Sequence, residues 1–341
     1  MTVGSATATL TGQVARLFFE RQLTKVEIAT RLGISRFRVA RLIDQALADG
    51  IVRIEFRDAP DRDLPLARAV EERFGLEVCV VAGSERDTTS ADVARLAGEV
   101  VDGLLGTGEA IGIAWGSTVA RVVDAIPTRN DASIDVVQLA GSSTSLDATT
   151  DPGDLTRVLA ARLGGRPHRI HAPAFVESAE LRAALLRVPE VAATVARFDD
   201  LAIALVGIGA FSAPAAASPR NAPSSSLLRS GSLSAADIVR LRELGAVGDL
   251  LVHPFDASGR FVAPDIAERA VAIDVERLRR IPRVVAVATG RAKVSAIRGA
   301  LATGVIRILV TDAATAASLV EPGQRPPRAT QRRARTRPRT R

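Results

Sequence analysis

Residues 112–118, Gly-Ile-Ala-Trp-Gly-Ser-Thr, place a glycine and two hydroxyl side chains directly after an apolar run. Gly116 lets the backbone approach a ligand closely, and Ser117 and Thr118 would start the next helix, whose N-terminal N–H groups attract anions. This pattern predicts a cradle for a phosphate group or for sugar hydroxyls. An ordinary strand-to-helix turn is the alternative interpretation of the same residues.

Three further loops of this kind follow apolar runs, at residues 138–143, 207–210 and 290–293. Lys293 falls in the first turn of a predicted helix, where a cation is mildly disfavoured, and this indicates that an anion binds there. A surface lysine without a ligand explains the same residue about equally well. The four loops together are the candidate binding site.

Two aspartates and three histidines are further candidate site residues. Asp249 and Asp312 could accept hydrogen bonds from sugar hydroxyls, although capping of the following helix is the preferred role of Asp312. His168, His171 and His253 are not in the four loops, so the loops lack a general base for sugar chemistry. His168 and His171 have the spacing of a metal pair, but neighbouring arginines and the lack of nearby acids or cysteines favour structural roles.

Apolar runs alternate with helical patterns from residue 76 to residue 320, and these elements must position the loops. The alternation is typical of an α/β protein with a mostly parallel, doubly wound, Rossmann-like sheet that is buried on both faces. The single cysteine, Cys79, falls within one such run and is expected in a buried strand. Because ligands bind beyond the carboxyl ends of strands in such sheets, the loops are expected to converge.

A different pattern occupies residues 13–56. Thr24 is a predicted N-cap with Glu27 as its capping-box partner, Gly33 ends that helix, and Ser35 caps a third helix. Three short helices with this punctuation predict a helix-turn-helix. The strand-like sequence that follows, ADGIVRIEF, resembles a wing, so the domain is expected to be winged-helix-like.

The third predicted helix carries four side chains near its N-terminal, outward side: Arg36, Phe37, Arg38 and Arg41. A recognition helix contacts base edges and phosphates with this region. With Thr24 and Ser35, these four residues are the predicted DNA contacts. A solvated basic face is the alternative for the arginines, and Phe37 could contact a thymine methyl group or shield its helix against the preceding one.

The formal net charge of +7 is unevenly distributed. Residues 322–341 hold eight Arg and no acid, and residues 1–57 hold nine basic against five acidic residues, so subtracting +8 and +4 leaves −5 for residues 58–321. A basic head on an acidic body is the electrostatic pattern of a DNA-binding module joined to a domain with another role.

Composition divides the chain into three parts. Residues 1–57 are the predicted helix-turn-helix domain, residues 58–320 the effector-binding domain, and residues 321–341 an Arg-rich tail expected to be disordered. The charged, proline-containing residues 57–65 mark the predicted hinge. Residues 212–234, rich in Ala, Pro and Ser, are expected to form a mobile loop near the pocket or a plain surface insertion. No apolar run reaches about 18 residues and no secretory signal is recognisable, so a cytoplasmic protein is expected.

Nearly the whole of residues 13–320 resembles the SorC family of sugar-responsive bacterial transcriptional regulators. The N-terminal match is IATRLGISRFRVARLIDQALADGIVRIEF, and later matches in order are GIAWGSTV, VVQLAG, LVGIGA, GAVGDLLVHPFDASGRFV and VVAVATGRAKVSAIRGALATGVIRILVTDAATA. The resemblance implies an effector domain with the fold of sugar-phosphate isomerases and deaminases, reused to sense a sugar or a phosphorylated sugar.

By motif, the resemblance assigns Gly116, Ser117 and Thr118 to the phosphate or hydroxyls of the effector, and Lys293 to its charge. It also implies effector contacts for five more residues: Gln138, Gly207, Gly209, Asp249 and Asp256. Family members more often carry a larger or charged residue where Ser117 stands, and the acidic body gives no long-range attraction for an anion. A phosphorylated sugar and a neutral sugar therefore both remain open.

These observations predict a sequence-specific DNA-binding transcriptional regulator of carbohydrate metabolism whose operator binding responds to a sugar or sugar phosphate. Paired half-sites require paired heads, so a homodimer or homotetramer is expected. No catalytic residue, metal site, cofactor or membrane association is predicted. The alternatives are a sugar-phosphate isomerase or deaminase fused to a DNA-binding head, and an architectural DNA-binding protein. The sequence does not distinguish an activator from a repressor.

Overall fold

The computed structural model describes residues 3–21, 23–52, 62–83, 88–143, 148–211 and 225–321. Contacts between Cα atoms divide the chain into two units, Met1–Ala59 and Pro60–Arg341. Each unit has its own buried hydrophobic cluster, so each is a separate structural unit. Residues 322–341 of the predicted tail are outside the described residues.

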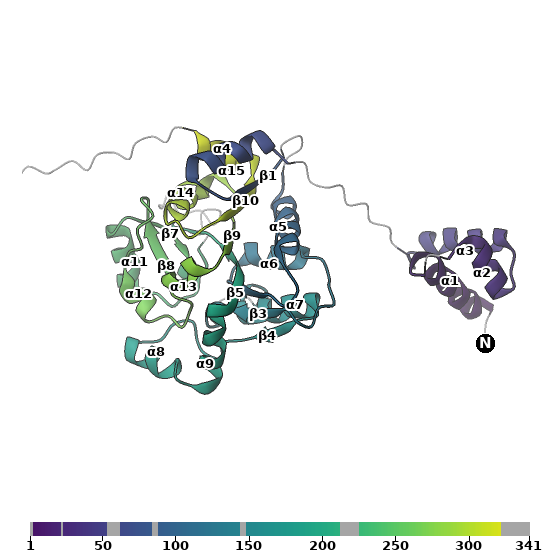
Figure 1. The fold of residues 1–341 in the computed structure, drawn as a ribbon, viewed down its shortest axis with the longest axis horizontal. Helices are drawn as coiled ribbons and strands as arrows, with labels where there is room; N and C mark the ends of the chain where they lie inside the picture. The colour runs from purple at the N-terminus through teal and green to yellow at the C-terminus, as the bar shows by residue number, and fades with distance from the viewer. Residues whose placement is uncertain are drawn as a thin grey trace, which may run out of the picture. The chain divides into compact units, whose positions relative to one another are not determined.

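The described residues of the first unit form three helices: α1 (Val3–Phe19), α2 (Lys25–Leu32) and α3 (Arg36–Ala48), shown in purple in Figure 1. α1 packs against both α2 and α3. Five buried side chains join the helices: Val14, Ile28, Val39, Leu42 and Ile43. The predicted helix-turn-helix is therefore confirmed. Of the expected wing, Ile51 and Val52 form a bend, and the residues after Val52 lie outside the described ranges.

The ends of α2 and the start of α3 have the caps that the sequence predicts. The Thr24 hydroxyl accepts the N–H of Glu27, and the Glu27 carboxylate accepts the N–H of Thr24 at 2.8 Å. Gly33 ends α2 at a φ of 65° and donates its N–H to the Ala29 carbonyl. The Ser35 hydroxyl accepts the N–H of Arg38 at 3.2 Å. These caps fix the turn that orients α3 against α2.

Replacing Thr24 by Ala should destabilise the first unit by about 1 kcal/mol, because the N–H of Glu27 at the start of α2 loses its side-chain acceptor. The measurement is the helical circular-dichroism transition of the full chain during thermal unfolding. Thr30→Ala is the control, because it removes a hydroxyl from the same helix without touching the cap. Hydrogen bonds from Thr24 lower the pKa of Glu27, so its contribution is present above the usual carboxylate range and is lost as the pH falls. Equal transitions for the two variants would contradict the capping role.

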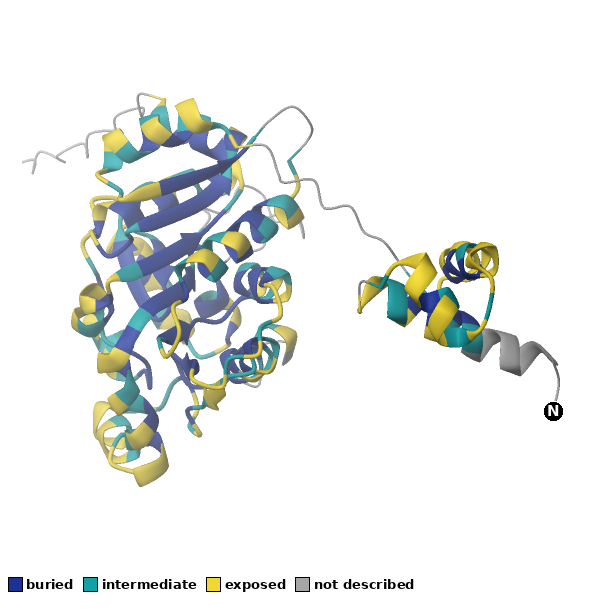
Figure 2. Ribbon diagram, turned by 45° about the vertical axis from the view of Figure 1, so that its right-hand side comes forward, coloured by how far each residue is buried: buried dark blue, intermediate teal, exposed yellow. Residues whose placement is uncertain are grey.

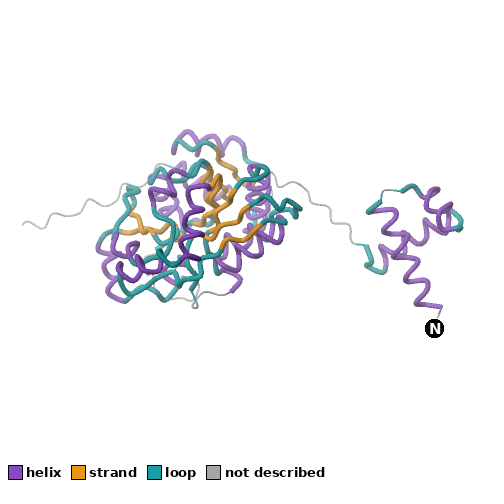
Figure 3. Tube along the Cα trace, turned by 60° about the horizontal axis from the view of Figure 1, so that its bottom comes forward, coloured by secondary structure: helices purple, strands orange, loops and turns teal. Residues whose placement is uncertain are grey.

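The described residues of the second unit form a seven-stranded sheet in which each pair of neighbouring strands is parallel. Its strands in spatial order are β1 (Val78–Ala82), β10 (Ile308–Asp312), β9 (Arg283–Val287), β5 (Leu201–Gly207), β2 (Ala110–Ile113), β3 (Asp135–Gln138) and β4 (Arg166–His168). Figure 3 shows these strands in orange with helices around them. The predicted parallel, doubly wound α/β fold is confirmed.

Helices cover both faces of this sheet. The group on one face consists of α5 (Ser90–Leu104), α6 (Ser117–Ala125) and α7 (Pro152–Leu163). The group on the other face consists of α4 (Leu64–Phe74), α14 (Val294–Ala302) and α15 (Ala313–Val320). Burial on both faces explains why the strands are near-continuous apolar runs, and Figure 2 shows them in dark blue with exposed residues on the outer sides of the helices.

The other described elements lie outside the parallel sheet and the helices named above. A second, antiparallel sheet contains β6 (Gly209–Ala210), β7 (Ala246–Leu250) and β8 (His253–Asp256). The remaining helices are α8 (Ala179–Leu185), α9 (Pro189–Ala196), α10 (Ser226–Arg229), α11 (Ala235–Glu243), α12 (Pro264–Glu268) and α13 (Val275–Arg280). Short 3-10 turns are η1 (Ala148–Thr150), η2 (Arg197–Asp200) and η4 (Arg291–Lys293).

Two expectations about this unit need correction. The run AVGDLLVH does not continue the alternation of the parallel sheet, because β7 pairs with β6 and β8 in the antiparallel sheet. The predicted hinge is also too long at its C-terminal end, since the Asp63 side chain caps α4 at the N–H of Leu66. Of the expected mobile loop, residues 212–224 lie outside the described residues, whereas Ser225 onward forms the buried start of α10.

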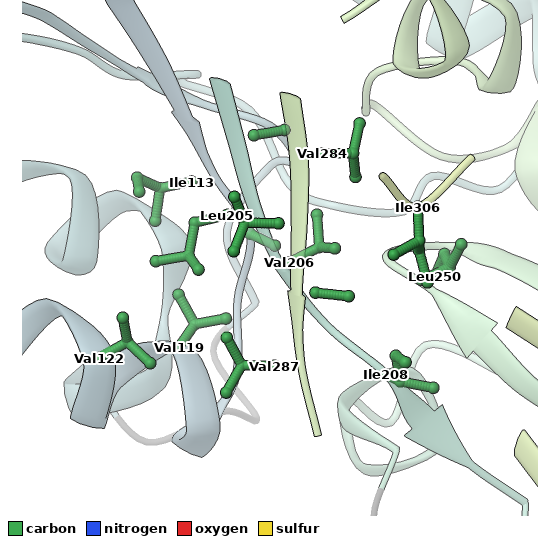
Figure 4. Packing of buried hydrophobic residues seen from close by; sticks show 14 of the residues in the cluster. Ile113, Val119, Val122, Leu205, Val206, Ile208, Leu250, Val284, Val287 and Ile306 are labelled. Atoms are coloured by element: carbon green, nitrogen blue, oxygen red, sulfur yellow. The ribbon is translucent and has the colours of Figure 1, made fainter. Parts of the chain in front are cut away.

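The core of the second unit fixes the strand ends relative to one another. Figure 4 shows Ile113 of β2 and Leu205 of β5 beside Val119 and Val122 of α6, and Val287 of β9 lies close to them. All five side chains are fully buried. The carboxyl ends of β2, β5 and β9 are therefore held together by close packing, and the loops that follow them have rigid supports.

Candidate functional site

The parallel sheet reverses its winding direction between β2 and β5. From β2 the chain proceeds to β3 and β4 on one side, and from β5 to β9 and β10 on the other. Ligands bind at such a switch point, beyond the carboxyl ends of the two strands. A cavity of about 230 Å³ lies there, lined by Ala114, Trp115, Gly116, Ser117, Thr118, Arg121, Gly207, Ile208, Gly209, Ser226, Arg229, Leu251, Thr289 and Lys293. We call it the switch-point pocket.

The turn before α6 forms one wall of this pocket. Gly116 has a φ of 111°, a conformation that L residues rarely adopt, and its N–H donates to the Thr150 carbonyl at 3.0 Å. A Cβ at Gly116 would lie 3.0 Å from Ser226 Oγ, so glycine also makes room for α10. Ser117 and Thr118 begin α6, where backbone N–H groups lack partners within the helix. The three residues can cradle an anion or a sugar hydroxyl.

Three cationic side chains line the same pocket: Arg121, Arg229 and Lys293. Lys293 is half-buried, and its Nζ donates to the Ile208 carbonyl at 3.1 Å. Burial lowers the pKa of Lys293, and the nearby Asp249 carboxylate partly opposes this effect. The two arginines are solvent-exposed, so solvent screens them more strongly. Lys293 is placed to make the strongest contact with an anion.

Sequence reasoning missed both arginines. Arg121 follows Thr118 by three residues on α6, so helical spacing from the hydroxyl pair could have revealed it. Arg229 lies in α10, within a serine-rich segment that has no apolar periodicity, and no sequence signal identifies it. Its Nη2 is 3.4 Å from Ser226 Oγ, another lining residue that was not predicted.

Asp249 lies beneath the pocket rather than on its surface. Its side chain belongs to β7, the residue is 2% exposed, and it is not among the lining residues. Oδ1 accepts the Ser225 hydroxyl at 2.5 Å. A Cβ on Gly209 would overlap this carboxylate, so glycine there leaves the space that Asp249 occupies. Burial raises the pKa of Asp249 to about 7, although Ser225 and Lys293 favour the ionised form.

The structure places Gln138 and Asp256 away from the pocket lining. Gln138 is fully buried, its Nε2 donates to the Ala140 carbonyl, and its Oε1 accepts the N–H of Ile170 at 2.9 Å. Asp256 organises a turn by accepting the N–H groups of Ser258 and Arg260. Both therefore have structural partners, whereas Gly207 and Gly209 line the pocket as the motif implied.

A second cavity, of about 780 Å³, lies at the carboxyl end of β3, and the residues that follow α10, from Ser230 to Ser232, form part of its lining. Its polar lining residues are Ser142, Ser143, Asp151, Asp154, Arg169, His171, Ser230 and Ser232. Asp151 accepts the Ser142 hydroxyl at 2.9 Å and caps α7 at the N–H of Gly153. The buried Gln138 side chain supports this cavity. Its hydrogen bonds hold the backbone at Ile170, which lines the cavity, and at Ala140, which precedes the lining residue Ser142.

The remaining candidate residues have local partners. His168 Nε2 lies 3.0 Å from Asp135 Oδ1, close enough for an ion pair although the angle does not suit a hydrogen bond. His253 is buried, and its Nε2 lies 2.8 Å from the Ile273 carbonyl. Burial raises the pKa of Cys79 to about 12, so this strand residue is a thiol at neutral pH. Asp312 caps α15 at the N–H of Thr315, as expected.

In the first unit, the predicted DNA contacts lie on the outward side of α3. Arg36, Phe37, Arg38 and Arg41 are exposed, while the opposite side buries Val39, Leu42, Ile43 and Ala46. Phe37 is 68% exposed, so it does not shield α3 against α2. The guanidinium of Arg36 lies 4.9 Å from the Phe37 ring centroid. The arrangement leaves three cations and one aromatic ring exposed on the surface of α3, the type of helix that enters the major groove in helix-turn-helix proteins.

Comparisons with known proteins agree with this architecture. The family model described as "Putative sugar-binding domain" matches residues 59–321. The chain is 30% identical to the sorbitol operon regulator of Klebsiella pneumoniae over 315 residues, which cover 91% of this chain and 96% of the relative. It is 29% identical to the erythritol catabolism regulatory protein of Brucella abortus, with 90% of this chain and 95% of the relative covered.

A solved structure gives the same result at the level of the fold. The crystal structure of the full-length sorbitol operon regulator from Klebsiella pneumoniae has a TM-score of 0.68 at 28% identity and covers 92% of this chain and 99% of that one. A helix-turn-helix head joined to a sugar-binding α/β unit defines the class of sugar-related transcriptional regulators. The chain belongs to the SorC family of these regulators. No helix in the described ranges is long and apolar enough to cross a membrane.

Proposed function

We propose that a sugar with one anionic group, such as a phosphate, binds the switch-point pocket and thereby modulates operator binding by α3. The observation that carries this proposal is the convergence of Lys293, Arg121 and Arg229 on the start of α6, where Ser117 and Thr118 add hydroxyls. Cations around a helix N-terminus favour a phosphate over a neutral hydroxyl. At the short range of the pocket, these charges outweigh the acidic body, whose field is screened over about 8 Å at physiological salt.

The sizes of the two cavities support a small ligand with a distinct polar end. The switch-point pocket, at about 230 Å³, is below the roughly 300–1,000 Å³ of pockets for drug-sized ligands. It accommodates the phosphate and the adjoining carbons of one sugar. The second cavity combines Asp151 and Asp154 with Arg169 and several serine hydroxyls, a balanced polar lining that suits the hydroxyls of the sugar body.

We propose that the pocket binds its ligand without converting it. Isomerisation or deamination of a sugar phosphate needs a carboxylate or histidine next to the reacting carbon. Among the described residues that line the switch-point pocket, none is an Asp, Glu or His. The relatives are also named as regulators. Absence of turnover on a panel of sugar phosphates is the expected result, and turnover would favour the enzyme hypothesis.

We propose further that Arg36, Phe37, Arg38 and Arg41 contact operator DNA, with Thr24 and Ser35 near the phosphates at the starts of their helices. A homodimer or homotetramer would supply the paired heads that paired half-sites require. A regulator that binds chromosomal operator DNA would be located in the bacterial cytoplasm. Residues 1–57 and 58–320 remain the proposed boundaries of the two functional domains.

The effector proposal is tested by thermal shift with matched pairs of ligands, each sugar beside its monophosphate. A ligand at 100 times its dissociation constant stabilises the folded state by about 2.7 kcal/mol. We expect one sugar phosphate to stabilise the chain while its unphosphorylated partner does so much less. Arg229→Met should reduce the shift, whereas Arg187→Met, at an exposed arginine away from the pocket lining, should not. Equal stabilisation by both members of the pair would contradict an anion site.

A further inference from the structure

Asp249 is a buried carboxyl group that directly underlies a cationic pocket. It is 2% exposed and does not line the pocket. Its Oδ1 accepts the Ser225 hydroxyl, and the same hydroxyl oxygen accepts the N–H of Leu228 at 3.1 Å as the cap of α10. α10 carries Arg229 into the pocket lining. Asp249 therefore holds a pocket cation in place through Ser225.

The charges that act on Asp249 come from the pocket side. Lys293 of η4 and Arg229 of α10 both favour its ionised form. Helix α14 packs on β7, and its residue next to Gly248 of that strand is the apolar Ala296. Helix α11 also contacts β7. Its Asp237 forms an ion pair with Arg269, and its Arg240 forms one with Asp265. Within this part of the described chain, Lys293 and Arg229 are thus the charged groups that act on Asp249, in addition to its burial and its hydrogen bond with Ser225.

Burial and these two cations act in opposite directions. Burial is the larger effect and raises the pKa of Asp249 from its ordinary value of 3.8 to about 7. The protonated and ionised forms are therefore both populated near neutral pH in the empty pocket. An anion that binds Lys293 and Arg229 adds a like charge and offsets the attraction that had favoured the carboxylate. Both changes shift Asp249 toward its protonated form.

We propose that Asp249 is a positioning residue that couples anion binding in the switch-point pocket to the uptake of one proton. On binding, the carboxylate takes a proton from solvent and becomes a carboxylic acid, while Lys293 and Arg229 transfer their electrostatic interaction from Asp249 to the anion. No other bond forms or breaks. This inference rests on the proposed function of the pocket as an anion site, and it predicts that effector affinity, and hence operator response, depends on pH.

The test measures the affinity of the full chain for inorganic sulfate by thermal shift between pH 6 and pH 8. Sulfate keeps its charge over this range, so its own titration does not contribute. For the wild-type chain, coupling to one proton is expected to weaken binding by roughly fivefold between pH 7 and pH 8. Asp249→Asn, which preserves the shape and the acceptor for Ser225, should bind sulfate with little dependence on pH. Asp124→Asn, at an exposed position on α6, removes the same charge and should retain the wild-type pH profile.

The outcomes separate this inference from the proposed function. Sulfate binding by the wild-type chain that is equal at pH 6 and pH 8 would overturn the proton coupling alone. If Asp249→Asn keeps the pH dependence of the wild-type chain, another group takes up the proton and the role of Asp249 is overturned. Absence of sulfate binding by the wild-type chain at every pH would overturn both the inference and the anion site.

A second measurement needs no ligand. Because the pKa of Asp249 is raised in the folded state, its stabilising contribution is fully present below pH 3.8 and is lost as the pH rises through about 7. The melting temperature of the wild-type chain should therefore fall relative to that of Asp249→Asn between pH 6 and pH 8. A constant difference between the two proteins over this range would contradict a titrating Asp249.

Discussion

Exchange of Lys293 for methionine is expected to raise the concentration of sugar phosphate needed to alter operator binding by roughly tenfold or more. A hydrogen bond to a charged group contributes about 1.5–3 kcal/mol, and Lys293 is the half-buried cation of the pocket. Operator binding without the sugar phosphate should persist, because α3 belongs to the other unit. The measurement is a gel-shift titration of operator DNA over a series of ligand concentrations.

The matched control for this experiment is Arg291→Met. Arg291 lies in the same 3-10 turn, is exposed, and does not line the switch-point pocket. An effector changes an equilibrium only through its different affinities for the two states, so loss of its contacts must remove the change in operator binding. A Lys293→Met chain that responds at the same ligand concentration as Arg291→Met would place the effector site elsewhere.

Replacing Arg41 by Ala is expected to weaken operator binding by about 1–3 kcal/mol, which corresponds to roughly five- to 150-fold. The helical period places Phe37 and Arg41 opposite the buried Val39, Leu42 and Ala46, so both face directly away from the core of the first unit. Arg36 lies against the Phe37 ring and is closer to the buried side, so Arg36→Ala should cost less. Affinity is measured at fixed salt, because phosphate contacts depend on it.

Arg187→Ala serves as the control for the change in net charge, since Arg187 is an exposed arginine of the second unit. The second unit should keep its melting temperature in both variants, which separates lost contacts from unfolding. If Arg41→Ala and Arg36→Ala bound operator DNA as tightly as Arg187→Ala, α3 would have no role as a recognition helix.

Local patterns predicted the fold where residue type alone determines geometry. The capping pair Thr24 and Glu27, and the left-handed Gly33, are short-range features, so the helix-turn-helix could be identified without tertiary information. Buried apolar runs likewise predicted the parallel sheet. They did not distinguish β7 from the other strands, because a fully buried strand has the same apolar sequence whichever neighbours it pairs with.

The pocket was predicted as far as its glycines, hydroxyls and Lys293, which follow directly from strand ends. α10 could not be predicted, because its burial depends on a contact between Ser225 and Asp249 that are 24 residues apart. The same contact explains why Asp249 lies beneath the pocket rather than in its lining. Gln138 was predicted to contact the effector but does not line the pocket. Its amide instead bonds to backbone groups of Ala140 and Ile170, which only the folded chain brings close.

The order in which the ribosome makes this chain matters for the switch-point pocket. Ser117, Thr118 and Arg121 belong to the half of the sheet that contains β2 and β3, whereas Thr289 and Lys293 follow β9 in the other half. The helix-turn-helix is complete once Ala48 has emerged, but the pocket lacks its half-buried cation until Lys293 has been added. A premature stop codon between these points would thus encode the helix-turn-helix without a complete switch-point pocket, and a reading-frame error shortly before Lys293 would alter the pocket while leaving the helix-turn-helix intact.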